Sequence, residues 1–148
     1  MRVEVDQSGK IGDTKVPTVL AFSDGESYAI LIPATVKRKC LQELRRRGKA
    51  GTSLYLHLFT AGLYLLLKDH IQNLNLIVMD IEYPGHEVKI EEQLLNQLRR
   101  EKAAVTGVKF DFLHIGKKSR AHEKALAVFN GDSRPNRTIG YREISARF

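Results

Sequence analysis

Two aspartates follow apolar stretches in distant parts of the chain, where a carboxylate is chemically unusual. Asp6 ends the alternating segment at the N-terminus, and Asp80 ends the apolar run LNLIVMD. A carboxylate beside a core is costly unless it is paired or bound to a cation. Two of them at neighbouring strand ends repel each other, and a divalent ion relieves that repulsion. The pair predicts a catalytic metal site, although each aspartate alone also suits a turn or a helix cap.

Histidines and glutamates supply further candidate ligands. His57 lies in a long apolar segment, and His122 lies near the start of a short helix. Imidazole binds transition-metal ions and, because it titrates near neutral pH, also carries protons. Both histidines are candidate metal ligands, and His122 is also a candidate catalytic proton carrier. A core hydrogen bond for His57 and an exposed helix start for His122 are the alternatives. Glu82 and Glu43 are reserve ligands, and Glu82 would share a face with Asp80 if the strand continued.

Positive charge is the second chemical signal. The chain has 24 Lys and Arg against 17 Asp and Glu, a formal net charge of +7, which favours a polyanionic partner such as nucleic acid. Two dense basic clusters are predicted to contact phosphates. They comprise Lys37, Arg38, Lys39, Arg45, Arg46 and Arg47, and then Lys117, Lys118 and Arg120. A solvated helix face is the alternative for the first cluster. Aromatic residues are few, so we expect recognition of a duplex backbone rather than base stacking.

Hydrophobic periodicity and turn residues predict the elements that must position these side chains. Strands are expected at residues 1–6, 16–22, 27–32, 74–80 and 108–115, and helices at 37–49, 52–71, 87–104 and 117–129. The polar tail has one further candidate strand at 138–144. Three antiparallel strands followed by strands alternating with helices imply a mixed sheet with helices on its faces. We therefore predict one α/β domain over residues 1–148, built on a mixed five-stranded sheet.

Three short segments resemble the ribonuclease H superfamily. RVEVDQSGK is similar to the opening strand of type 2 ribonucleases H, and LIVMDIEY is similar to the fourth strand of type 1 enzymes, which ends in Asp. SRAHEKALA resembles the start of the last helix in type 1 enzymes and RuvC-type resolvases. The order of elements also resembles this superfamily, with one additional helix between the third and fourth strands. The resemblance implies a ribonuclease H-like fold.

The resemblance also implies a particular metal centre. Gln7 stands where the type 2 motif has Glu, and His57 and His122 stand where other members have carboxylates. The implied ligands are therefore Asp6, Asp80, His57 and His122, with two Mg²⁺ or Mn²⁺ ions. The implied activity is hydrolysis of phosphodiesters in an RNA-containing duplex or a structured nucleic acid. The alternative is an inactive ribonuclease H-like module that only binds nucleic acid.

Cysteine content and the N-terminus bear on location. Cys40 is the only cysteine, so no intrachain disulfide is possible, and the N-terminal segment has no apolar signal core. Both features favour a cytoplasmic protein. The longest apolar run, residues 54–67, is too short to span a bilayer, so no membrane partner is expected. A homodimer remains open.

Overall fold

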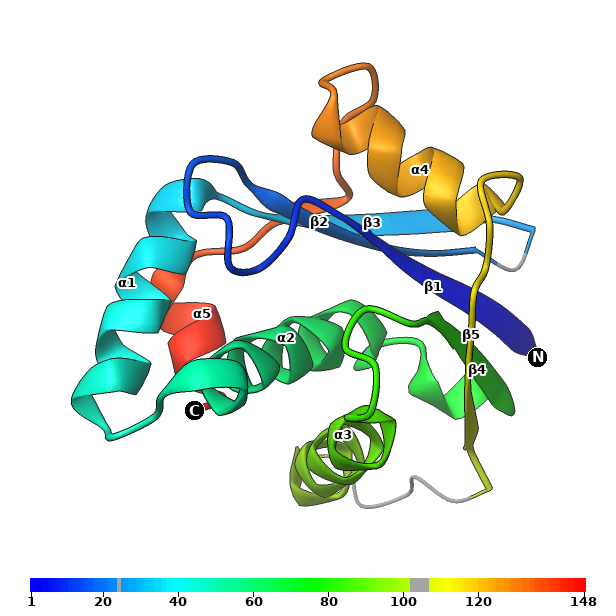
Figure 1. Cartoon of the computed structure of the whole chain (residues 1–148). Helices are drawn as coiled ribbons and strands as arrows, with labels where there is room; N and C mark the ends of the chain where they lie inside the picture. The colour runs from blue at the N-terminus through cyan, green and yellow to red at the C-terminus, as the bar shows by residue number, and fades with distance from the viewer. Residues whose placement is uncertain (24, 102–106) are drawn as a thin grey trace.

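A six-stranded mixed sheet forms the centre of the structure, a computed structural model that describes residues 1–23, 25–101 and 107–148. The strands lie in the order β5-β4-β1-β2-β3-β6 (Figure 1). They are β1 (Arg2–Ser8), β2 (Thr18–Ser23), β3 (Ser27–Ile32), β4 (Leu76–Asp80), β5 (Lys109–Leu113) and β6 (Arg137–Thr138). The first three form the antiparallel meander that was predicted, whereas β4 pairs parallel with β1, β5 with β4 and β6 with β3. The predicted α/β class is confirmed.

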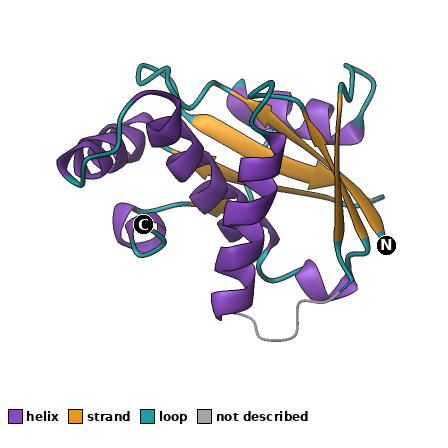
Figure 2. Cartoon of the chain, turned by 60° about the horizontal axis from the view of Figure 1, so that its bottom comes forward, coloured by secondary structure: helices purple, strands orange, loops and turns teal. Residues whose placement is uncertain are grey.

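Helices cover both faces of this sheet. The five α-helices are α1 (Ala34–Arg46), α2 (Gly51–Leu67), α3 (Glu87–Glu101), α4 (Arg120–Phe129) and α5 (Tyr141–Ser145), and a short 3-10 helix, η1, covers Ile71–Asn73. α4 packs on one face against β1, β2 and β3, while α2 packs on the other and is itself flanked by α3 (Figures 1 and 2). Among the described residues, no helix combines the length and apolar character that spanning a bilayer requires.

Consecutive residues of a strand point to opposite faces of the sheet. Because the central strands carry consecutive apolar residues, both of their faces are apolar. Leu20 and Ile30 pack into the large core beneath α2, whereas their neighbours Val19 and Ala29 pack beneath α4. Gly62 lets α2 approach closely, since a Cβ atom there would lie 2.8 Å from the Leu20 Cδ1 atom. The sheet is thus a buried layer whose strand ends carry the polar residues.

The structure corrects two predictions about the C-terminal half. The sheet has six strands rather than five, because the tail adds β6 beside β3. The strand expected at 138–144 is wrong beyond Thr138, since the chain turns at Gly140 into α5, which buries Ile144. The helix expected at 87–104 is confirmed through Glu101, and its last three positions lie outside the described residues.

Candidate metal centre and basic surfaces

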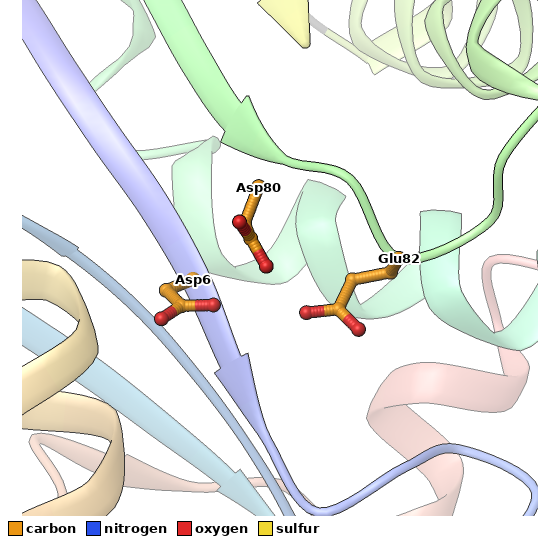
Figure 3. Close-up of side chains that lie close together, drawn as sticks. All are labelled: Asp6, Asp80 and Glu82. Carbon is orange, nitrogen blue, oxygen red and sulfur yellow. The ribbon is translucent and has the colours of Figure 1, made fainter. Parts of the chain in front are cut away.

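Three carboxylates converge where β1 and β4 run side by side. The parallel register pairs Val5 with Met79, so Asp6 and Asp80, one residue further along, are neighbours. Glu82 follows β4, and its side chain points back toward them (Figure 3). One oxygen from each of the three side chains lies within 4.8 Å of the others. The structure therefore brings together the two predicted aspartates and the reserve candidate Glu82.

Hydrogen bonds hold the two aspartates in this arrangement. Asp6 is only 6% exposed; its Oδ1 accepts the backbone N–H of Gln7 at 2.8 Å. Its Oδ2 lies 2.8 Å from Nδ1 of His122, which donates when Asp6 is ionised. Asp80 Oδ1 accepts the backbone N–H of Ile115 at 2.9 Å. Each aspartate is therefore held in place by at least one partner outside the carboxylate group.

The proximity of three acids makes their simultaneous ionisation costly. Burial, the charges of Asp80 and Asp6, and a hydrogen bond with Asp80 together raise the pKa of Glu82 to about 8. Burial also raises the pKa of Asp6, against hydrogen bonds from Gln7 and His122 that lower it. A divalent cation compensates the same repulsion, and hard cations such as Mg²⁺ prefer carboxylate oxygens. The donor set therefore fits a metal ion.

Stability should reflect the protonation of Glu82. An unfolded Glu has an ordinary pKa of 4.5, whereas the raised pKa of folded Glu82 keeps it protonated to about pH 8. The folded state binds more protons between these values, so its stability falls as pH rises through this window. In EDTA, we expect the melting temperature of the wild type to fall relative to that of Glu82→Gln between about pH 5 and about pH 8. Thermal melts over this range measure the difference, and parallel curves for the two proteins would contradict it.

His122 and His57 have different positions relative to the cluster. His122, on the first turn of α4, contacts it through Asp6, as its predicted place implies. His57 is not a member of the carboxylate group and instead lines a separate cavity between α2 and α3, with Thr60 and Gln93 among its neighbours. α2 turns the ring of Phe59 toward Asp6 and Asp80, and a residue two positions away points roughly 200° around a helix. The structure therefore does not bring His57 to the predicted metal centre.

Lys37 is a second correction. It was predicted to contact phosphates, but its side chain is completely buried. Its Nζ donates to the carbonyl oxygens of Lys10 at 3.0 Å and Asp13 at 2.6 Å, and to the Thr18 hydroxyl at 3.1 Å. Burial lowers its pKa to about 8. Lys37 therefore ties the loop between β1 and β2 to α1 and is not available to a ligand.

The other basic residues of α1 lie on its exposed surface in two groups. Arg46 and Arg47 form ion pairs with Glu43. Glu43, a reserve candidate for a metal ligand, is not a member of the carboxylate group formed by Asp6, Asp80 and Glu82. Arg38 and Arg45 instead line an open cavity of about 460 Å³ beside the loop between β1 and β2. Lys39 is exposed. The predicted basic cluster is thus divided: Lys37 is buried, Arg46 and Arg47 are paired with Glu43, Arg38 and Arg45 line a cavity, and Lys39 is exposed.

The second basic cluster lies at the start of α4. Lys117 is exposed in the segment before α4, and Lys118 and Arg120 line a shallow cleft with Arg2. The same cleft includes Glu4, which shares a strand face with Asp6 because the two are two residues apart on β1. None of the three carboxylates lines this cleft, so these cations lie toward the start of β1 on the face of the sheet that carries α4.

Nothing in the sequence indicated that two further residues, Lys10 and Tyr55, lie near the carboxylates. Lys10 and Tyr55 line a cavity of about 260 Å³ together with Glu82. Lys10 is an isolated lysine in a loop, and Tyr55 lies in an apolar helix where an aromatic side chain normally indicates core. The nonlocal packing of the loop against α2 brings them to the site.

Comparison with known proteins adds no family assignment. No family model, curated protein or solved structure matches this chain.

Proposed function

We propose that this protein is a metal-dependent nuclease with a ribonuclease H-like fold. The observation that carries the proposal is the convergence of Asp6, Asp80 and Glu82 within 4.8 Å. The layout supports it as well, because the first acid lies on β1 and the second ends β4, as in the superfamily that the sequence resembles. Exposed basic residues on α1 and at the start of α4 suit a polyanionic substrate.

Each residue of the site has a proposed task. Asp6, Asp80 and Glu82 would hold Mg²⁺ or Mn²⁺, for which the resemblance implies two ions. The bound metal would activate water as a Lewis acid and offset negative charge on the phosphodiester. Hydrolysis would break one P–O bond, giving a phosphate monoester and a hydroxyl group. His122 is a positioning residue that fixes the orientation of Asp6 through Nδ1.

Labelled nucleic acids test this proposal directly. We expect cleavage of at least one structured substrate among an RNA–DNA hybrid, double-stranded RNA and a DNA four-way junction, in Mg²⁺ or Mn²⁺ and not in EDTA. Absence of cleavage of all three with either metal would contradict it. Equal cleavage by the Asp80→Asn variant would identify a contaminating nuclease and would equally remove support.

An inactive nucleic-acid-binding module is the second candidate. It is favoured by one observation: the basic residues beside the site do not depend on the carboxylates for their positions. Arg120, for example, donates to the Gly25 carbonyl, and Arg38 donates to the Thr14 carbonyl. This candidate predicts binding that weakens steeply with salt, without cleavage under any metal.

A further inference from the structure

Two neighbouring cavities lie between the acidic cluster and the basic residues of α1. The first, of about 260 Å³, is lined by Glu82, Lys10, Gly12 and Tyr55 among others. The second, of about 460 Å³, shares Gly12 and Tyr55 with the first and is also lined by Arg38 and Arg45. We call the two together the Tyr55 groove. Its lining thus includes one proposed metal ligand, Glu82, one aromatic ring and two arginines.

The walls of this groove are fixed by hydrogen bonds from α1. Lys37 donates to the carbonyls of Lys10 and Asp13, and Arg38 donates to the carbonyl of Thr14 at 2.7 Å. In Figure 1 the loop between β1 and β2 lies beside α1, above the start of α2. Because this loop is anchored to α1, the groove is a formed feature of the fold.

The narrow junction of the groove lies between Gly12 and Tyr55. A Cβ atom at Gly12 would lie 3.5 Å from two atoms of the Tyr55 ring, so the backbone of the loop passes next to that ring. Gly12 itself is exposed and Tyr55 is partly buried against the core. A side chain at position 12 would therefore contact the Tyr55 ring where the two cavities meet, and a large one would extend into them.

We propose that the Tyr55 groove binds a single-stranded segment of the substrate adjacent to the phosphodiester that is cleaved. This inference rests on the proposed function, because the cluster defines where cleavage occurs. A basic groove that contains an aromatic ring is the usual platform for single strands: arginines contact phosphates, and an unpaired base stacks on the ring. The bases of a duplex are already stacked and paired, and they cannot reach Tyr55 in this way. Asp13, which also lines the groove, accepts the backbone N–H of Lys15.

The experiment compares binding of tailed and blunt nucleic acids in EDTA by fluorescence anisotropy, in the Asp80→Asn background. The probes are a blunt duplex and the same duplex with a single-stranded DNA or RNA tail. We expect the tailed probes to bind about tenfold more tightly, since stacking of one base contributes a factor of this order. Tyr55→Leu and Gly12→Leu should remove the preference for tails, whereas Tyr55→Phe should keep it because phenylalanine also stacks.

Charge is tested by a matched pair of double variants. Arg38→Gln with Arg45→Gln should lower the slope of log Kd against log salt for tailed probes by about 1.4, as expected for two phosphate contacts to a single strand. Arg99→Gln with Arg142→Gln removes two exposed arginines outside the groove and should leave the tail preference unchanged. Thermal melts check that each variant is folded.

The outcomes separate this inference from the proposed function. Equal affinity for blunt and tailed probes would overturn the proposal that the Tyr55 groove binds a single strand, even if the protein cleaves nucleic acid. Equal effects of the two double variants on the salt dependence of binding would overturn it as well. A tail preference that depends on Tyr55 supports the groove even if no substrate is cleaved. In that case the nuclease proposal alone fails.

Discussion

Replacing Asp80 by asparagine is expected to abolish nuclease activity while leaving the fold intact. Asparagine keeps the oxygen that accepts the Ile115 N–H, so the contact between β4 and the segment after β5 survives. It removes one of three negative charges from the metal centre, and metal affinity depends strongly on that charge. We expect the cleavage rate to fall by at least about 10³-fold, roughly 4 kcal/mol of transition-state stabilisation.

The same substitution should affect stability in the opposite direction when metal is absent. The charge of Asp80 contributes to the raised pKa of Glu82, and once Glu82 ionises the repulsion between the two carboxylates costs free energy in the folded state. Asp80→Asn should therefore melt at a higher temperature than wild type in EDTA above about pH 8, where Glu82 is ionised. Mn²⁺ should raise the melting temperature of the wild type more than that of the variant. A variant that retains activity, or that loses it only by unfolding, would contradict the assigned role.

Lys37→Met is expected to have the largest effect on stability. The ammonium group of Lys37 donates to two backbone carbonyls and one hydroxyl, and its side chain is completely buried. Methionine fills similar space but leaves these acceptors without their donor, and each unpaired buried group is costly. We expect a loss of about 2–4 kcal/mol in the free energy of unfolding, measured by urea denaturation.

Lys39→Met is the matched control for this prediction. It lies two residues away on the same helix and is exposed, so its replacement should change stability by less than about 0.5 kcal/mol. Lys37→Met should also loosen the loop that forms one wall of the Tyr55 groove, because Lys10 and Asp13 lose their anchor. Hydrogen exchange of that loop should then increase. Equal stability of the two variants would show that the buried contacts of Lys37 do not stabilise the fold.

Much of the fold could be predicted because its signals are local. Alternation along β1 and the apolar run of β4 specify strands, and the amphipathic pattern of α3 specifies a helix. The positions of Asp6 and Asp80 at equivalent points of these strands followed from the same patterns. Their actual proximity required one further fact, the parallel pairing of β1 with β4. The C-terminal tail was harder, because β6 has only two residues and depends on β3 for its existence.

The burial of Lys37 was indicated by the helical spacing of the sequence, but the surrounding positive charge favoured a surface position. It lies at the spacing of Cys40, Leu41 and Leu44, and these four residues form the buried face of α1. The helical period puts position 37 on the buried face, but the neighbouring basic residues led to the prediction of a surface cluster. A buried lysine needs acceptors, and only the packed loop between β1 and β2 provides them.

The α/β class, the pairing of the two aspartates and the excess of positive charge follow from the order of the amino acids alone. The place of Glu82 in the cluster, the position of His57 beside α3 and the position of Tyr55 in the groove became evident only in the folded chain. The difference lies in the range of the interactions. Strands and helices follow from patterns over a few residues, whereas the rotation of a helix and the path of a loop depend on contacts between distant segments.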